Sequence, residues 1–371
     1  MLQDYRLNEI HGECLKVWGR TNGVLTPLTV FWTAGGIELH VRASELWLEI
    51  ETDYDCYELW GSVLVNGAHI SRQMLPKGKS WLCLFRNMNP ETDKTVRFMR
   101  DLQAMSDDMG AKLQIHAVRT DGDFLPVEER KYKLEFIGDS ITSGEGTIGA
   151  KEELDWISMF FSSVRDYPTL VSAECNAEYH VISQSGWGVL SGWDNNPYCA
   201  LPKYYEKVCG ILKGDRNRAL GAMEDYDFTL WQPDAVIINL GTNDGGALDQ
   251  PQWQDPETGE TFKQHKKEDG RMEEADAERF SDGVREFLKK LRRYHPDAQL
   301  VWAYGMLGSL MMPYIRKGIH DYQMETGDAK VSFVLLPETT ETSVGSRSHP
   351  GQKNHAEAAN VLSRYLKAVL Q

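Results

Sequence analysis

The pattern of apolar residues changes near residue 130, and this change constrains the fold more than any other feature of the 371-residue chain. Before it, apolar and polar residues alternate in short runs, at 37–41, 46–50, 81–85 and 113–117. A period of two is typical of strands with one buried face. Turn pairs such as Asn22-Gly23 and Asn66-Gly67 separate the runs. Many short strands at this spacing predict an all-β sandwich of the jelly-roll form.

After residue 130, short apolar strands alternate with amphipathic helices. The candidate strands are 134–138, 179–183, 235–240, 300–304 and 332–336. Strands separated by helices predict a three-layer α/β domain with a parallel sheet. At roughly 150 residues per domain, the length suits two domains. We therefore expect a sandwich at 1–125 and an α/β domain at 126–371.

Composition and charge exclude several classes of protein. The formal net charge is −15, and no basic patch interrupts it, which argues against a nucleic-acid or anionic-membrane partner. The longest uncharged run, 298–315, contains Gly305, Gly308 and Pro313, and fits a strand, a loop and a helix start better than a membrane span. No His-Glu-x-x-His or comparable cluster exists, so we expect no metal site. Nothing in the sequence indicates the oligomeric state.

Cysteine usage and the first residues bear on location. None of the six cysteines forms a Cys-x-x-Cys pair, which favours free thiols in a reducing compartment. Residues 1–6 lack the basic start and apolar stretch of a signal peptide. We expect a cytoplasmic protein, and the alternative is an exported one whose leader has been removed.

Four residues of chemical interest lie where predicted strands end or where the last helix begins: Ser140, Gly186, Asn243 and His349. Each alone has a plain structural interpretation: a helix cap, a tight turn, an Asn turn and a surface histidine. Together they offer a nucleophile that opens a helix, two oxyanion donors and a general base. Because the carboxyl ends of parallel strands converge, we expect the four to form one site. Residues and spacing alone therefore predict an acyl hydrolase.

This joint pattern resembles the SGNH hydrolases, whose catalytic domain is flavodoxin-like. The flanking Gly-Asp-Ser, Gly-Thr-Asn-Asp and His-Pro sequences match as well. Over essentially its whole length the chain also resembles carbohydrate esterase family 2, in which a jelly roll precedes an SGNH domain. The blocks that carry this resemblance are 17–20, 138–146, 231–234 and 302–306. It implies removal of acetyl groups from plant polysaccharides or oligosaccharides such as xylan and glucomannan, without metal or organic cofactor.

The resemblance also assigns roles. His349 takes the Ser140 proton, and the N–H groups of Ser140 and Gly186 with the Asn243 amide hold the oxyanion. Many SGNH enzymes have an aspartate three residues before the histidine, whereas this chain has Ser346. Two interpretations stay open. Either a Ser–His dyad uses a backbone carbonyl to orient the imidazole, or a carboxylate from the same loop does so, Glu338 or Glu341 being the candidates.

Aromatic residues after the second loop are candidates for sugar contact. Trp187, Trp193 and Tyr198 could form a wall for a sugar ring, with packing on the sheet edge as the alternative, above all for Trp187. Two other functions remain as competitors. One is a lipase or thioesterase of the same superfamily, and the other is a carbohydrate-binding protein in which the jelly roll binds and the α/β domain is inert.

Overall fold

The computed structural model describes residues 1–370, which divide into two compact units. Unit 1 comprises residues 1–130, 156–164 and 206–226, and unit 2 comprises 131–155, 165–205 and the chain from 227 on. The chain thus passes from unit 1 to unit 2 for the first time after Arg130. Two segments of the later chain belong to unit 1, because Phe161 lies in the core of the sandwich and the Val208 carbonyl accepts the Trp32 indole N–H at 2.7 Å.

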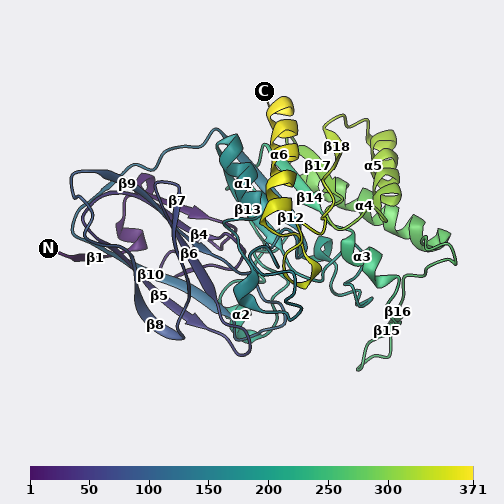
Figure 1. The fold of residues 1–371 in the computed structure, drawn as a ribbon, viewed down its shortest axis with the longest axis horizontal. Helices are drawn as coiled ribbons and strands as arrows, with labels where there is room; N and C mark the ends of the chain where they lie inside the picture. The colour runs from purple at the N-terminus through teal and green to yellow at the C-terminus, as the bar shows by residue number, and fades with distance from the viewer. Residues whose placement is uncertain (371) are drawn as a thin grey trace. The chain divides into compact units, whose positions relative to one another are not determined.

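Unit 1 is a sandwich of two antiparallel sheets (Figure 1). The first has the order β1-β10-β5-β8 with β3 beside β10, and the second has the order β11-β4-β9-β6-β7 with β2 beside β4. The strands are β1 (Gln3–Arg6), β2 (Leu15–Trp18), β3 (Leu28–Thr29), β4 (Gly36–Arg42), β5 (Leu46–Asp53), β6 (Trp60–Val65), β7 (Ala68–Met74), β8 (Gly78–Phe85), β9 (Asp93–Arg100), β10 (Lys112–Thr120) and β11 (Asp123–Leu125). Its helical turns are η1 (Leu7–Glu9), η2 (Gly12–Cys14), η3 (Ser158–Phe160) and α2 (Asp215–Ala219).

The alternation in the sequence corresponds to the two faces of these strands. In β5, Leu46, Leu48 and Ile50 are fully buried, whereas Trp47 and Glu49 are partly exposed. Each such aliphatic side chain contributes about 1.5–3 kcal/mol by leaving water. The prediction of an all-β sandwich is therefore confirmed.

Unit 2 contains a parallel sheet with the order β13-β12-β14-β17-β18. Its strands are β12 (Tyr132–Gly138), β13 (Ala177–Ser183), β14 (Ala235–Asn239), β17 (Gln299–Tyr304) and β18 (Val331–Leu335), and β15 (Trp253–Gln254) pairs with β16 (Thr261–Phe262) in a separate hairpin. The helical elements are α1 (Tyr167–Cys175), η4 (Leu201–Tyr204), α3 (Thr242–Ala247), α4 (Glu274–Tyr294), α5 (Met312–Thr326), η5 (Ser346–Ser348) and α6 (Gln352–Val369). The expected strands lie within two residues of the observed ones.

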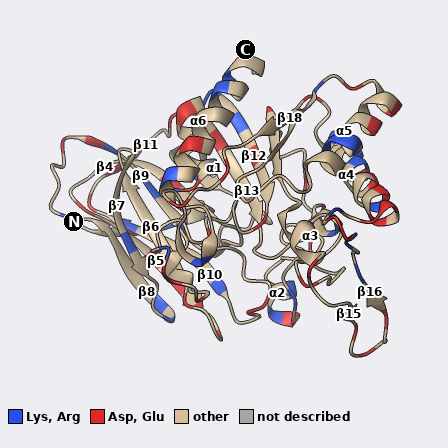
Figure 2. Ribbon diagram, turned by 45° about the vertical axis from the view of Figure 1, so that its right-hand side comes forward, with Lys and Arg blue, Asp and Glu red and all other residues tan. Residues whose placement is uncertain are grey.

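Helices cover both faces of this sheet. Helix α1 packs against α6, and α4 packs against α5, with the sheet between the two pairs (Figure 1). Figure 2 shows basic and acidic residues interspersed along α4 and α5, and Lys289 pairs with both Glu286 and Glu325 there. Such exposed pairs contribute little to stability. The predicted three-layer α/β domain is therefore confirmed. Because helices cover both faces of its sheet, we look for the functional site in the loops at the strand ends.

The segment after β12 differs from the expected helix. Residues 140–148 form consecutive turns, although the sequence predicts a helix that opens at Ser140. Gly144 and Gly146 have φ values of +76° and +72°, in the left-handed region that ends a helix. The Glu145 N–H donates to the Ser140 carbonyl at 3.0 Å and closes the loop. Ser140 therefore stands in a glycine-containing turn, without the helix dipole that the sequence suggested.

Candidate active site

Ser140 follows β12 directly, and its neighbour Asp139 fixes the turn. The buried Asp139 carboxylate accepts the Ile141 N–H at 3.0 Å. Asp139 thus supplies the capping bond of this turn. The Ser140 side chain is thereby left for another partner. Its Oγ lies 2.9 Å from Nε2 of His349, and the serine is 5% exposed. Two residues that are 209 positions apart in the chain are thus within hydrogen-bonding distance.

His349 lies between η5 and α6, and both of its ring nitrogens have partners. Nδ1 lies 2.9 Å from the backbone carbonyl oxygen of Arg347. A carbonyl can only accept, so Nδ1 carries the proton and Nε2 is free to accept the hydrogen of Ser140. Arg347 has φ 55° and ψ 33°, a left-handed conformation that side-chain-bearing residues rarely adopt. The loop thus presents a backbone carbonyl at the position where a triad has a carboxylate.

The two carboxylates that the sequence offered for this role lie elsewhere. Glu338 and Glu341 are exposed and line an open hollow of about 380 Å³, together with Ser348. Within residues 1–370, neither has a hydrogen bond to His349. The carboxylate beside the imidazole is Glu145, whose Oε1 lies 3.7 Å from Nε2. Sequence reasoning missed Glu145 as a site residue, although it falls inside the block 138–146 that carries the family resemblance.

The second and third loops approach the same place. Gly186 follows β13 with φ +79°, and a Cβ on it would lie 3.0 Å from the Trp193 ring. Asn243, in α3, donates from Nδ2 to the Trp187 carbonyl at 2.9 Å and to Asp139 Oδ2 at 3.3 Å. The amide of Asn243 therefore links the third loop to the second loop and to the residue before Ser140.

Buried carboxyl groups surround these loops. Asp244 accepts the N–H groups of Val189 and Leu190, each at 2.8 Å, and so fixes the second loop. Burial raises the pKa of Asp244 to about 6. Burial also raises the pKa of Asp139 to about 7, with a smaller contribution from the charges of Asp244 and Glu145. The site is therefore one in which negative charge is costly.

His355 in α6 is the other histidine near the site. Its Nδ1 accepts the Tyr167 N–H at 3.1 Å, and its Nε2 lies 3.0 Å from the Thr147 hydroxyl. Burial, with a smaller contribution from His349, lowers the pKa of His355 to about 3. His355 is therefore neutral at ordinary pH, and its ring serves to join α1, α6 and the turn after β12.

The aromatic candidates separate by exposure. Trp193 is 52% exposed and lies beside Gly186, so its ring is available to a ligand. Trp187 is only 5% exposed because its ring packs edge-on against Tyr204. This burial favours the packing alternative for Trp187 over a sugar contact. Tyr198 is partly exposed and packs against Trp253 of the β15–β16 hairpin.

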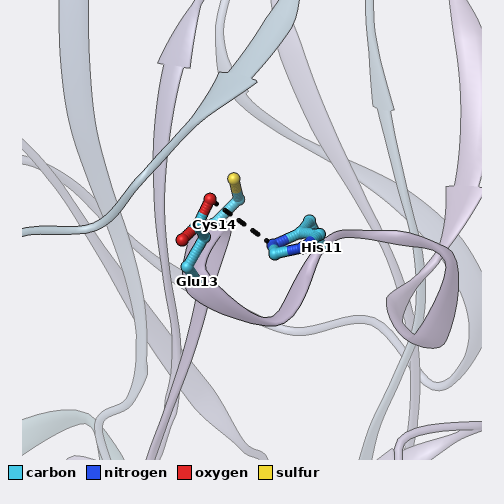
Figure 3. Close-up of side chains that lie close together, drawn as sticks. All are labelled: His11, Glu13 and Cys14. Atoms are coloured by element: carbon cyan, nitrogen blue, oxygen red, sulfur yellow. Dashed lines mark ion pairs between the residues drawn. The ribbon is translucent and has the colours of Figure 1, made fainter.

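One group of side chains within residues 1–370 could offer atoms to a metal ion: His11, Glu13 and Cys14 of unit 1 (Figure 3). His11 Nδ1 and Glu13 Oε1 are 3.6 Å apart, and both side chains are largely exposed. Burial, helped by the charge of Glu13, raises the pKa of the Cys14 thiol. Metals bind the thiolate, so this environment opposes binding. The group is an exposed ion pair beside a buried thiol.

Among the described residues, none of the helices has the length and apolar character needed to span a membrane.

A strand-end serine paired with a histidine, on a parallel sheet covered by helices, defines an SGNH-type hydrolase domain. Comparison with known proteins agrees. Residues 136–332, just over half of the chain, match the GDSL-like Lipase/Acylhydrolase family. This chain belongs to that family.

Three individual relatives show which kind of enzyme in this family the chain resembles. An acetyl xylan esterase from the rumen bacterium Butyrivibrio proteoclasticus is 47% identical, with a TM-score of 0.97 over 100% of this chain and 98% of that one. A family two carbohydrate esterase from Clostridium thermocellum, solved with cellohexaose, is 21% identical and has a TM-score of 0.79 over 96% and 99%. The cellulase/esterase CelE of Acetivibrio thermocellus is 24% identical over 91% of this chain, which spans only 37% of CelE. The resemblance to family two carbohydrate esterases is thus confirmed.

Proposed function

We propose that this chain is a serine esterase that removes O-acetyl groups from plant polysaccharides or their oligosaccharides, such as xylan and glucomannan. The observation that carries the proposal is the 2.9 Å contact between Ser140 Oγ and His349 Nε2, with the opposite ring nitrogen on the Arg347 carbonyl. The description of the 47% identical relative as an acetyl xylan esterase supports acetylated xylan as a substrate.

In the proposed reaction, Nε2 of His349 takes the proton of Ser140 as Oγ bonds to the acetyl carbon. The carbonyl oxygen becomes an oxyanion. When the bond between the carbon and the sugar oxygen breaks, His349 returns the proton to that oxygen and the deacetylated sugar leaves. Water then attacks the acetyl-enzyme, again giving its proton to His349. As the bond between the acetyl carbon and Oγ breaks, His349 returns this proton to Oγ, so that acetate leaves and the Ser140 hydroxyl is restored.

We assign the oxyanion site to the N–H groups of Ser140 and Gly186 and to the Asn243 amide. Donors of this kind act when they are already directed at the place where charge develops. The Asn243 amide has one short bond, to Trp187, and one longer bond of 3.3 Å, to Asp139. The longer bond is the one that an oxyanion would replace. Because the pKa of Asp139 is raised, its carboxyl group is more often protonated and accepts the Asn243 amide hydrogen less strongly than an oxyanion would.

The test is acetate release from acetylated xylo- and manno-oligosaccharides, measured beside hydrolysis of short- and long-chain acyl esters. Ser140→Ala is expected to lower turnover by about 10³-fold or more while leaving the fold intact by circular dichroism. A preference for long acyl chains would favour a lipase or thioesterase instead. Sugar binding without hydrolysis by the unaltered protein would favour a carbohydrate-binding role.

A further inference from the structure

Glu145 connects three of the loops that form the site. Its side chain is 4% exposed, and Oε1 accepts from Nη1 of Arg347 at 2.5 Å. Oε2 accepts the Ser185 hydroxyl at 2.6 Å, directly before Gly186. A buried carboxylate is costly unless it is paired and hydrogen-bonded, and here both oxygens are engaged. The proposed reaction does not use Glu145, so the presence of this buried carboxylate in the site needs another explanation.

We propose that Glu145 is a positioning residue for His349, and that it acts both by holding Arg347 and by placing a negative charge beside the imidazole. This inference rests on the proposed esterase function. It assigns to Glu145 part of the work that a triad carboxylate does, but from the opposite side of the ring.

The geometry of Arg347 carries the first half of the proposal. Arg347 and Ser348 have φ values of 55° and 57°, so two successive residues are held in the left-handed region. Such a backbone persists only where surrounding contacts hold it. The backbone N–H of Arg347 donates to the Glu153 carbonyl at 2.6 Å, and its guanidinium donates to Glu145. These two bonds fix the residue whose carbonyl receives Nδ1–H of His349.

The charge of Glu145 carries the second half. Its Oε1 lies 3.7 Å from Nε2 of His349, the atom that gains a proton in the reaction. A carboxylate at this distance stabilises an imidazolium, whereas the Arg347 cation opposes it. The Ser140 hydroxyl also faces the ring, and His355, which is near enough to interact with His349, is neutral. The charges of Glu145 and Arg347 therefore act on the imidazolium in opposite directions, while both residues act together on its position.

The opposed signs allow a test that a merely structural role would not pass. Enzyme labelled with ¹⁵N in histidine is titrated by NMR, and kcat/KM for 4-nitrophenyl acetate is followed against pH. Because Glu145→Gln removes a negative charge beside the imidazole, it is expected to move the acid limb of the profile to lower pH. Arg347→Met removes the opposing cation and is expected to move that limb to higher pH. Both variants should lower kcat about tenfold or more with KM nearly unchanged.

Matched variants separate charge from position. Arg347→Lys keeps the cation but loses the planar fork, so it should lower kcat without moving the acid limb to higher pH. Glu341→Gln removes an exposed carboxylate from the same loop and should leave both quantities unchanged. A fall in kcat without movement of the acid limb in either variant would show that Glu145 only supports the structure, and would overturn the proposal. Full activity of both variants would overturn it as well.

The two proposals fail separately. Because the NMR titration needs no substrate, opposite displacements of the imidazole ¹⁵N curves in the two variants would support the role of Glu145 even if the enzyme released no acetate. Acetate release that depends on Ser140, together with an unshifted His349, would instead uphold the esterase and reject the positioning role. Arg347 is partly exposed, so Arg347→Met tests the proposal even if Glu145→Gln fails to fold.

Discussion

Nδ1 of His349 lies 2.9 Å from the backbone carbonyl oxygen of Arg347, and a left-handed residue supplies that carbonyl. The carbonyl fixes the tautomer, because it can only accept, but it adds no formal charge to stabilise the imidazolium. Position 346, three residues before the histidine, holds a serine. Of the two interpretations that the sequence left open, this contact favours the dyad with a backbone orienter over a carboxylate at Nδ1.

The first prediction concerns the two carboxylates on the loop before His349. Because Glu338 and Glu341 are exposed and line a separate hollow, Glu338→Gln and Glu341→Gln should each leave kcat/KM within about twofold of the unaltered enzyme. The measurement is the initial rate of acetate release across several substrate concentrations. A loss approaching that of Ser140→Ala in either variant would show that a carboxylate orients His349 during turnover.

The second prediction separates the two tryptophans of the second loop. Trp193→Ala should raise KM for acetylated xylo-oligosaccharides by about tenfold, since it removes one exposed ring that can stack on a sugar. Its kcat for 4-nitrophenyl acetate, which has no sugar, should stay nearly unchanged. Trp187→Ala should instead lower the melting temperature, because the buried ring leaves a cavity beside Tyr204. An unchanged KM for xylo-oligosaccharides in Trp193→Ala would exclude a sugar contact.

The third prediction follows from the pKa of Asp139, which burial raises from 3.8 to about 7. The folded state therefore prefers the protonated carboxyl. Its contribution to the free energy of unfolding is fully present below pH 3.8 and is lost as pH rises through about 7. Asp139→Asn cannot ionise, so its melting temperature relative to the unaltered protein should rise between pH 5 and pH 8.

The change in that difference with pH is the quantity to measure, by differential scanning fluorimetry at several pH values. Effects of the substitution that do not depend on pH cancel in this comparison. A difference that stays constant from pH 5 to pH 8 would show that Asp139 is ionised throughout. Glu341→Gln serves as the control, because its exposed carboxyl should give no pH-dependent difference.

The sequence predicted the parts of this structure that depend on local pattern. Period-two runs identified strands such as β5, and the strand ends located Ser140 and Gly186. The turn after Ser140 was missed, because a glycine such as Gly144 or Gly146 ends a helix only where it takes a positive φ, and spacing does not reveal that. Glu145 was missed because its partners Ser185 and Arg347 lie 40 and 202 residues away. Contacts between distant loops have no periodic signal.

The last prediction concerns Gly146, where the turn after β12 touches the loop that carries His349. A Cβ here would lie 2.5 Å from the Ser346 carbonyl oxygen and 2.8 Å from the His349 Cβ, and φ is +72°. Atoms at such distances must move, so Gly146→Ala should displace the imidazole from Ser140 and lower kcat by about 100-fold.

Gly259 provides the matched control, since its φ is +75° and no atom lies within 4 Å of its ideal Cβ. Gly259→Ala introduces a similar backbone strain, about 1–2 kcal/mol, without the clash. Gly146→Ala should therefore lose at least as much stability as Gly259→Ala in a thermal melt, while only Gly146→Ala loses activity. If the two variants keep the same kcat, then the close approach of these loops does not hold His349 in place, because a shift of about 1 Å at the base would be felt in turnover.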